Sequence, residues 1–358
     1  MQQIRVPQAE AGRRIDKYLM KYFDAAPKSF IYKAFRKKNI KLCGKRAAGN
    51  ELLNEGDLIE LFFSDETIAS MRKTPVGNHK VPAGDKATLR EYCEIVYEDK
   101  DVIFADKREN VLSQKAEPGD YSLNEALLDY CGGKPEASSF IPSVCNRIDR
   151  NTTGLVCFVK SYKAARLLSE MLRDRSLEKY YLAAVSGVVN EAAHVEAWLV
   201  KDKKSNKVTV YDRPSAGAEH IETAFRPIDR SEAEVLGIGS GGVVSNLTDV
   251  ESSKPTTSAT KGKLGKYPYT FVKVELITGK SHQIRAQLAA MGHPLLGDLK
   301  YGSRELNKYL AEEYGIRSQL LHAWEMHFPK DTPSPLDTFA GKSVRTKTPE
   351  WVKQLRIE

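Results

Sequence analysis

Features that mark secreted, membrane-spanning and metal-binding proteins are scarce in this sequence. Its five cysteines are odd in number and form no Cys-x-x-Cys pair, which argues against a disulfide framework and against a zinc cluster. No stretch approaches the roughly 18 consecutive apolar residues that a membrane span requires. We therefore expect reduced cysteines, a cytoplasmic location and no membrane partner.

Signatures of the common enzyme classes are also missing or incomplete. No Gly-x-Ser-x-Gly segment is present, so a serine hydrolase is not indicated. The segment GIGSGG at 237–242 fits a dinucleotide-binding pattern, but the residues after it predict no helix that could hold a pyrophosphate. In HAWEMH at 322–327 the two histidines do not have the spacing of a zinc-binding HExxH helix. The sequence predicts chemistry without a cofactor and without a metal.

What the sequence does contain is an uneven distribution of positive charge. The chain has 358 residues, of which 41% are hydrophobic and 28% charged, so it is long enough for two globular domains. The formal net charge is +8, and residues 1–62 hold 13 Lys and Arg against 7 Asp and Glu. Three quarters of the positive excess therefore lies in this N-terminal segment, which favours an anionic partner there.

The N-terminal segment predicts two amphipathic helices followed by short strands. In GRRIDKYLMKYF, apolar residues recur at helical spacing and would bury one stripe. A second helix is expected after Pro27, with Ser29 as its N-cap. Its apolar face holds Ile31, Ala34 and Phe35, and its basic face holds Lys33, Arg36 and Lys37. A basic stripe on a helix is more often solvated surface than a binding site, so this pattern alone leaves the function open.

The order of these elements resembles the RNA-binding domain named after ribosomal protein S four. The segments GRRIDKYL, KSFIYKAFRKKNIKLCGK and NELLNEGDLIEL follow the order of that domain. The resemblance implies that RNA is the anionic partner and that Lys33, Arg36, Lys37 and Lys45 contact it. We expect this domain over residues 1–64.

A linker and a larger domain are expected to follow. Residues 65–91 contain several Pro and Gly and lack clear periodicity, which predicts a linker. Over residues 92–358, strand-like runs such as CEIVY and LVCFV alternate with helical patterns, and Ser122 and Glu125 fit a capping box. This alternation predicts an α+β domain. Residues 231–266, rich in Gly, Ser, Thr and Lys, predict a flexible insertion between two strands.

Three blocks in the larger domain resemble the large-subunit ribosomal RNA pseudouridine synthase family, in its branch with an N-terminal S four-like domain. The blocks are NRIDRNTTGL, KYYLAAVSG and LITGKSHQIRAQLAAMGHPLLGDLKYG, and LLHAWEMHF follows them. The resemblance implies a mixed, largely antiparallel sheet with the active cleft across it. It also implies that uracil is detached from C1′ of a uridine in RNA, turned, and rejoined through C5, without a cofactor.

The resemblance implies three catalytic residues in these blocks. Asp149 matches the catalytic aspartate, and this reaction needs a carboxylate as a nucleophile or as a base. Arg285 matches the arginine that pairs with the aspartate, which would offset the cost of burying a negative charge. Tyr181 matches the family's tyrosine, for which the resemblance implies stacking on the target base and a role in moving a proton. In a regular strand Tyr180 would face the other side of the sheet.

Substrate-binding roles are implied for Arg147, Arg150, Lys280 and His282. A stacked uridine must be extruded before it can react, and Arg147 would occupy the vacated space or grip the backbone. Arg150 would contact a phosphate or close the turn. Lys280 keeps the positive charge of the more usual arginine but loses its bidentate geometry.

Other functions remain compatible with parts of the sequence. A noncatalytic RNA-binding or ribosome-assembly factor would keep the architecture, but it would not need an acid in a cleft that faces an anionic polymer. An RNA methyltransferase would need a glycine-rich cofactor loop after a strand, which is not evident. The substrate could also be transfer RNA. The sequence also leaves open whether Asp149 attacks the sugar, attacks the base or removes a proton. We expect a monomer.

The charge distribution generates a first prediction. Deleting residues 1–62 should weaken RNA binding and flatten its dependence on salt, because fewer phosphate contacts release fewer counterions. Binding constants measured across a salt series test this. An unchanged slope would place the electrostatic footprint elsewhere on the chain.

Overall fold

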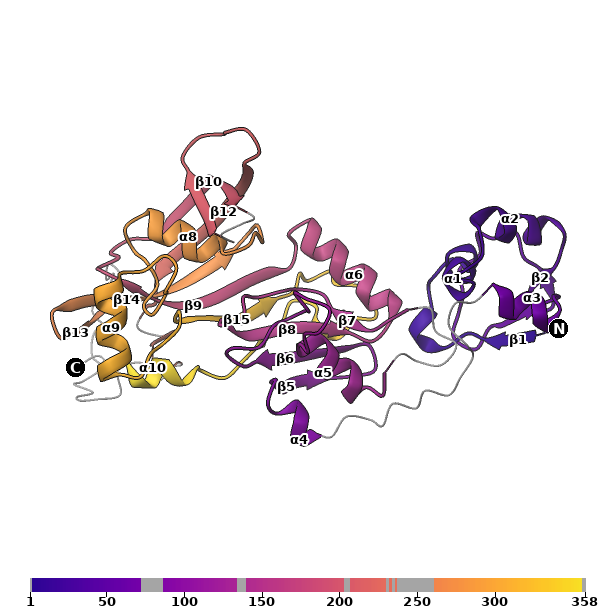
Figure 1. The fold of residues 1–358 in the computed structure, drawn as a ribbon, viewed down its shortest axis with the longest axis horizontal. Coiled ribbons are helices and arrows are strands. Elements are labelled where there is room, and N and C mark those ends of the chain that lie inside the picture. The colour runs from indigo at the N-terminus through magenta and orange to yellow at the C-terminus, as the bar shows by residue number, and fades with distance from the viewer. Residues whose placement is uncertain are drawn as a thin grey trace.

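The computed structural model describes residues 2–71, 86–133, 140–202, 207–229, 232–233, 236 and 261–355. These residues form two units, each built on its own β-sheet (Figure 1). None of the helices in these ranges is long and apolar enough to cross a membrane.

Residues 2–71 form the N-terminal unit, in which helices pack on a small antiparallel sheet of order β1-β4-β2-β3. The predicted stripe of the first helix is confirmed, since Ile15 and Leu19 are fully buried. The elements are β1 (Gln2–Arg5), η1 (Gln8–Glu10), α1 (Ile15–Tyr22), α2 (Lys28–Arg36), β2 (Ile40–Leu42), β3 (Lys45–Arg46), β4 (Leu58–Leu61) and α3 (Asp65–Ser70).

Two expectations about this unit need correction. The second helix does begin after Pro27, but Ser29 is not its N-cap: Pro27 occupies that position with an extended backbone, and Ser29 lies inside the first turn. Residues 65–70, expected to begin the linker, instead form α3, whose N-cap Ser64 accepts a hydrogen bond from the Thr67 N–H. Ile68 of α3 belongs to the core of the N-terminal unit, so packed structure extends beyond residue 64.

The larger unit contains a mixed sheet of twelve strands among its described residues. The central path runs β11-β10-β12-β14-β9-β15-β8-β6-β5, with β13, β16 and β7 paired to β14, β15 and β8. The strands are β5 (Cys93–Glu98), β6 (Val102–Lys107), β7 (Ser143–Val144), β8 (Thr153–Val159), β9 (Glu178–Ser186), β10 (Ala193–Asp202), β11 (Lys207–Tyr211), β12 (Glu219–Pro227), β13 (Lys261–Leu264), β14 (Tyr267–Leu276), β15 (Leu321–His327) and β16 (Ser343–Arg345). The expected mixed, largely antiparallel sheet is confirmed.

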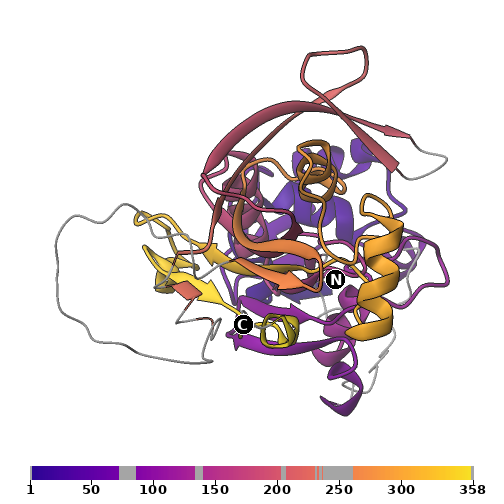
Figure 2. The ribbon, with the colours of Figure 1, turned by 90° about the vertical axis from the view of Figure 1, so that its left-hand side faces the viewer.

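Helices cover both faces of this sheet. The helices are α4 (Lys86–Leu89), α5 (Leu123–Tyr130), α6 (Tyr162–Arg173), α8 (Gln283–Ala290), α9 (Arg304–Glu313), η3 (Asp337–Phe339) and α10 (Glu350–Gln354). The capping box predicted for Ser122 and Glu125 is present at the start of α5. In Figure 2, α8 and α10 lie on opposite sides of β14.

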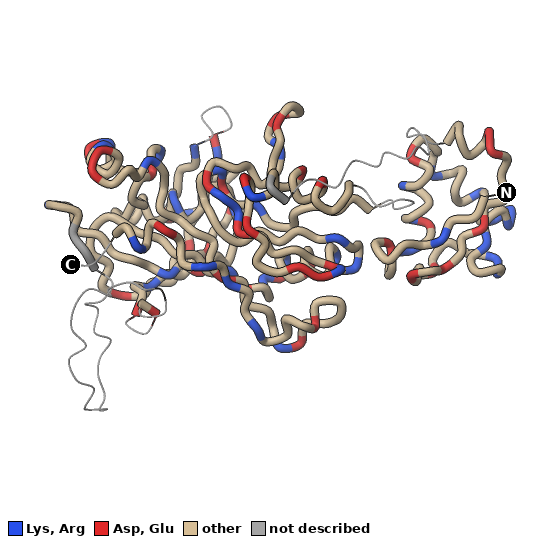
Figure 3. The backbone as a smooth tube through the Cα atoms, turned by 90° about the horizontal axis from the view of Figure 1, so that it is seen from below, with Lys and Arg blue, Asp and Glu red and all other residues tan. Residues whose placement is uncertain are grey.

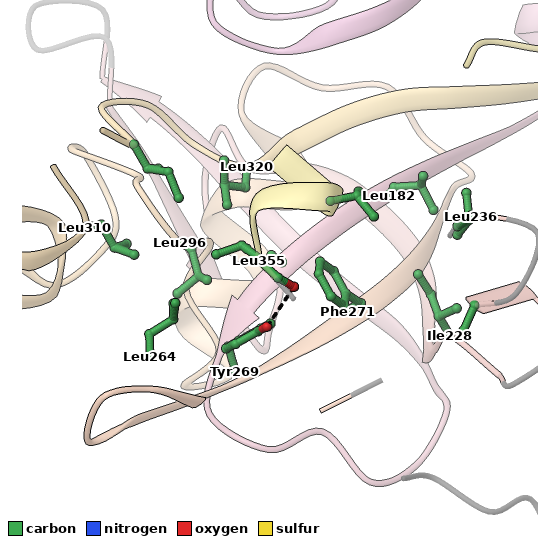
Figure 4. Packing of buried hydrophobic residues seen from close by; sticks show 14 of the residues in the cluster. Leu182, Ile228, Leu236, Leu264, Tyr269, Phe271, Leu296, Leu310, Leu320 and Leu355 are labelled. Atoms are coloured by element: carbon green, nitrogen blue, oxygen red, sulfur yellow. Dashed lines mark hydrogen bonds between the residues drawn. The ribbon is translucent and has the colours of Figure 1, made fainter. Parts of the chain in front are cut away.

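Strand β9 separates two hydrophobic cores because successive side chains of a strand face opposite sides. Leu182 and Ala184 pack in a core closed by α9 and α10, where the Tyr269 hydroxyl also donates to the carbonyl of Leu355 (Figure 4). Tyr181 and its alternate neighbours face the other core, which α8 covers. One face of β9 thus packs in the core closed by α9 and α10, and the other face packs in the core covered by α8.

The two halves of the large sheet meet where β15 lies beside β8. This pair is parallel, whereas the other strand pairs in the described ranges are antiparallel. The pairing joins Gly154 to Ala323. Gly154 has φ +109°, and a Cβ at this position would lie 2.1 Å from the carbonyl oxygen of Ala323. Only glycine permits this close approach.

The expected insertion is shorter than predicted at its C-terminal end. Residues 261–264 were expected to belong to it, but they form β13, which pairs with β14. Pairing with a long neighbouring strand provides backbone partners that the composition of this segment does not reveal. Ala233 and Leu236 are buried in the core beneath α9 and α10, and residues 237–260 lie outside the described part of the chain.

The junction generates a second prediction. Gly154→Ala should lower the free energy of unfolding by more than about 3 kcal/mol, because its Cβ would overlap the backbone of β15. Gly217→Ala is the control, since Gly217 also has positive φ but has no atom within 4 Å of its Cβ position. The control should lose about 1 kcal/mol. Equal losses in urea denaturation would show that backbone strain, and not the close approach, matters at Gly154.

Candidate active site

The three predicted catalytic residues meet at the junction of the two half-sheets. Asp149 lies in the loop that leads into β8, Tyr181 lies in β9, and Arg285 lies in α8. They line a small hollow of about 50 Å³, whereas two hollows of about 400 and 410 Å³ lie elsewhere. The functional groups in its lining, and not its volume, identify the small hollow as the candidate site. Its lining consists of Arg147, Ile148, Asp149, Thr152, Tyr181, Leu276, Lys280, His282, Gln283, Ile284, Arg285 and Leu321.

Arg285 contacts two carboxylates. Its Nη1 donates to Asp149 Oδ2 at 2.9 Å, while Nε and Nη2 donate to the two carboxylate oxygens of Asp298 at 2.8 and 3.0 Å. The Asp298 side chain is fully buried, whereas 26% of the Asp149 side chain is exposed. Asp298 therefore fixes the guanidinium through a bidentate pair, and the remaining nitrogen holds the accessible carboxylate.

The charges of this cluster stabilise one another. Burial alone would lower the pKa of Arg285, but hydrogen bonds and charge from Asp298, followed by those from Asp149, raise it. Burial alone would raise the pKa of Asp298, but the guanidinium and the backbone N–H groups of Lys300 and Tyr301 hold it below its usual range. Arg285 and Asp298 therefore stay ionised at neutral pH.

Asp298 was not identified as a site residue from the sequence. Its position inside the block LLGDLKYG was the only signal, because nothing local indicates which distant group a buried aspartate will meet. Its backbone carbonyl also accepts a hydrogen bond from Asn307 Nδ2 at 2.8 Å, which connects the loop to α9. The support of Arg285 thus extends into the core.

The loop that carries Asp149 is anchored from beneath by Lys107, a second residue that sequence reasoning missed. Lys107 is fully buried, and its Nζ donates to the carbonyl oxygens of Arg108, Val111 and Arg150 at 2.9, 2.8 and 2.8 Å. Burial lowers the pKa of Lys107 to about 7, and the negative charge of Asp149 opposes that shift. The hydrogen bond to Arg150 ties β6 to the residue next to Asp149.

Two polar side chains hold the same loop from its flanks. Ser113 Oγ donates to the carbonyl of Ile148 at 2.9 Å and accepts from the N–H of Ile148 at 3.1 Å. Asn146 bridges to β8, because its Nδ2 donates to the carbonyl of Leu155 and its Oδ1 accepts from the N–H of Cys157. Asp149 is therefore presented by a loop with fixed ends.

The two adjacent tyrosines of β9 face opposite sides of the sheet, as predicted. Tyr181 is 6% exposed and lines the hollow, and burial, then the charge of Asp149, raise its pKa. Tyr180 packs its ring under the Lys273 ammonium and donates its hydroxyl to Glu178. Of the pair, only Tyr181 lines the hollow that contains Asp149.

Of the four predicted substrate-binding residues, Arg147, Lys280 and His282 line the hollow, whereas Arg150 is not part of its lining. Lys280 forms an ion pair with Glu219 of β12, so its charge is already partnered at the rim. His282 precedes α8 with φ +54°, and its Nδ1 lies 2.9 Å from the hydroxyl of Tyr301. Burial lowers the pKa of His282, which favours the neutral ring. Arg147 and Arg150 are exposed, and Arg147 lines the hollow.

The predicted RNA-binding residues do not belong to this hollow. Lys33, Arg36, Lys37 and Lys45 are exposed on the N-terminal unit. In the larger unit, His322 of the HAWEMH segment lies in β15 and not in a helix, with ring nitrogens 2.7 and 2.6 Å from the hydroxyls of Thr153 and Thr346. Among the described residues, no three His, Cys, Asp or Glu side chains are arranged to hold a metal ion.

Comparison with known proteins agrees with this geometry. The family model described as RNA pseudouridylate synthase matches residues 101–290, more than half of the chain. The chain belongs to this family. The match includes Asp149, Tyr181 and Arg285, and the synthase is accordingly an isomerase that acts on RNA.

Individual relatives extend the similarity beyond that segment. An RNA pseudouridine synthase of Mycoplasma pneumoniae is 28% identical over 344 residues, which cover 95% of this chain and 92% of the relative. The ribosomal large subunit pseudouridine synthase C of Vibrio cholerae is 28% identical over 330 residues, covering 92% and 89% of the two chains. The structure of human RNA pseudouridylate synthase domain containing 4 has a TM-score of 0.50 at 19% identity and covers 75% of this chain and 92% of its own. That likeness supports the fold.

The bidentate support of Arg285 generates a third prediction. Asp298→Asn keeps the size of the side chain, but its amide nitrogen would face donors from Arg285 or from the backbone. We expect kcat to fall about 10²-fold, because Arg285 would no longer position Asp149. The free energy of unfolding should fall by about 3 kcal/mol.

Activity must be measured where the variant is fully folded, so that lost stability is not read as lost catalysis. Asp174→Asn is the matched control, because the Asp174 carboxylate is exposed and its hydrogen bonds within the described part of the chain are to Ser176 in the same turn. An unchanged kcat for the folded Asp298 variant would contradict the positioning role.

Proposed function

We propose that this synthase converts uridine in large-subunit ribosomal RNA to pseudouridine, with Asp149, Arg285 and Tyr181 as its catalytic residues. The ribosomal substrate is supported by the name of the Vibrio cholerae relative, which matches over nearly the whole chain. The catalytic assignment is supported above all by the 2.9 Å contact between Arg285 and Asp149 inside one hollow.

The reaction balances without any further reactant. The bond between N1 and C1′ breaks, a bond between C5 and C1′ forms, the hydrogen on C5 leaves as a proton, and N1 gains a proton. The chemistry therefore needs one group that can attack or accept a proton, a neighbour that keeps this group charged and oriented, and a surface that holds the base while it turns.

Asp149 fits the first of these roles. Its carboxylate is partly exposed to the hollow, so a substrate atom can reach it, while Arg285 fixes one oxygen and leaves the other available. The same free oxygen could attack C1′, attack the base or remove a proton. In each case Arg285 contributes by holding the carboxylate in one orientation through the contact to Oδ2.

Tyr181 fits the role of a surface for the base. Its ring lies in the wall of the hollow beside Ile284 and Leu321, and its raised pKa keeps the hydroxyl protonated at neutral pH. A neutral aromatic ring can contact the face of a uracil throughout the rotation, because stacking imposes little directional demand. We assign the attack or proton removal to Asp149 and the contact with the base to Tyr181.

Residues at the rim would receive the extruded nucleotide. We propose that Arg147, which is exposed and lines the hollow, fills the space left in the RNA or grips its backbone. Arg150 and Lys280 would contact phosphates. For Lys280, a phosphate of the RNA would replace the carboxylate of Glu219 as the partner of the ammonium group. Neutral His282 would offer a hydrogen bond at the entrance.

We propose that the N-terminal unit is an S four-like RNA-binding domain joined to a catalytic domain that begins near residue 92. Its basic residues Lys33, Arg36, Lys37 and Lys45 are exposed and would contact phosphates. Figure 3 shows Lys and Arg interspersed with Asp and Glu along the backbone of both units. The N-terminal surface would add affinity that does not depend on the chemistry.

The central test is Asp149→Asn. We expect at least a 10³-fold loss of tritium release from RNA labelled at uridine C5, because the carboxylate that attacks or accepts a proton is gone. Folding should be retained, since Arg285 keeps its buried partner Asp298. Asp174→Asn, an exposed control, should release tritium normally. Normal release by the Asp149 variant would refute the catalytic assignment.

The substrate is tested separately by mapping pseudouridine in cells with and without the gene. Loss of one or more sites from large-subunit ribosomal RNA is expected. Losses confined to transfer RNA would reject the ribosomal target while leaving the chemistry intact. A change of mass in the modified RNA would indicate methylation, because pseudouridine and uridine have the same mass.

A further inference from the structure

The N-terminal unit contacts the larger unit through a buried carboxylate. Glu10, in η1, is fully buried, and its Oε1 accepts a hydrogen bond from the backbone N–H of Phe140 at 2.5 Å. Its Oε2 accepts from Arg13 Nη1 at 2.9 Å. Glu10 and Arg13 belong to the N-terminal unit, whereas Phe140 belongs to the larger unit, 130 positions away in the sequence. One carboxylate thus joins both units.

The partner of Glu10 also reaches across. Arg13 is 5% exposed, and its guanidinium carbon lies 4.9 Å from the ring centre of Tyr162, the first residue of α6. The rings of Tyr162 and Phe140 pack edge to face at 6.4 Å. At Gly12, where φ is +81°, a Cβ would lie 3.8 Å from the side chain of Lys163. These contacts connect η1 to the N-terminal end of α6 (Figure 1).

A unit that is only loosely tethered would not be expected to bury charged side chains such as Glu10 and Arg13 where the two units meet. Removing a carboxylate and a guanidinium from water is costly unless each finds directional partners, and here the partners come from both units. The backbone N–H of Phe140 and the face of Tyr162 restrict the orientation as well as the distance. We propose that Glu10 and Arg13 dock the N-terminal unit on α6 in one orientation, so that RNA held by that unit is presented to the Asp149 hollow.

This docking makes α6 the connection between the two RNA-contacting regions. Figure 1 places α6 between the N-terminal unit and α8. The exposed face of α6 carries Lys163, Arg166 and Arg173, of which Arg166 is paired with Glu170. A long RNA bound at both ends would follow this surface. A fixed geometry raises the effective concentration of the second contact once the first has formed. This consequence rests on the proposed RNA-binding role of the N-terminal unit.

The docking is tested by a distance measurement that does not depend on activity. One nitroxide label is placed on the exposed native Cys43 and the other on Lys308→Cys, whose position on α9 is 76% exposed. The parent protein should give one narrow distribution of distances between the labels. Glu10→Ala and Tyr162→Ala should each broaden it, since they break the contact from opposite sides. Tyr121→Ala, which removes an exposed tyrosine packed on Tyr92, should leave it narrow.

Kinetics test the consequence for catalysis. On a full-length transcript of large-subunit ribosomal RNA, both docking variants should show kcat/KM lowered about tenfold, chiefly through KM. A short stem-loop that carries the target uridine would reach only the hollow. On this substrate, kcat/KM of both docking variants should match that of the parent protein. Neither residue lies in the hollow, so kcat should not change.

The outcomes separate the docking from the proposed function. A broad distribution in the parent protein, or one that stays narrow in both variants, would overturn the docking even if the RNA is modified normally. Broadening without any loss on the long RNA would overturn the positioning role. If ribosomal RNA is not a substrate, the distance measurement still decides whether Glu10 and Arg13 hold the units together. Tyr162→Ala covers the case in which Glu10→Ala unfolds the N-terminal unit.

Discussion

The guanidinium of Arg285 forms ion pairs with two carboxylates, those of Asp298 and Asp149. The position of Asp149 in the cleft depends on which guanidinium nitrogens bind each carboxylate. Asp298 occupies two of these nitrogens in a bidentate contact, so the planar group cannot rotate, and Nη1 is left directed at Asp149. The buried carboxylate thus orients an arginine that in turn orients the accessible one. A lysine would supply the charge but not this direction, because its ammonium is a point charge on a flexible chain.

The acid also needs a loop that does not move. Asp149 precedes the parallel junction between β8 and β15, where His322 pairs with Thr153 and Ala323 with Gly154, and side chains add to the support of the loop. Lys107 donates hydrogen bonds to three carbonyl oxygens, one of them that of Arg150 next to Asp149. Ser113 bonds to both the N–H and the carbonyl of Ile148, and Gly154 permits the close approach of the two strands. A reactive group on a loop is precise only when the surrounding scaffold is rigid. Here that scaffold comes from both half-sheets.

Positioning recurs on a larger scale between the two units. A synthase that extrudes one uridine from a folded RNA must overcome the free energy of base stacking. Binding elsewhere on the RNA can offset this free energy only if the two binding regions keep a fixed relative position. Glu10 and Arg13 provide a directional contact between the units that resembles the one in the active site: in both, a buried carboxylate fixes an arginine that reaches a second element. The same physical device thus occurs twice.

Much of the fold, and six of the residues that line the hollow, could be named from the sequence, because they depend on local patterns or lie in the three blocks. The buried stripe of α1, the capping box of α5 and the opposite facing of Tyr180 and Tyr181 follow from neighbours within a few residues. The tertiary structure alone decided which distant groups meet: Asp298 with Arg285, Lys107 with Arg150, and Glu10 with Phe140 are 13, 43 and 130 positions apart. The physical reason is that a polar contact gains strength from burial, and burial is a property of the whole packed chain that no local pattern records.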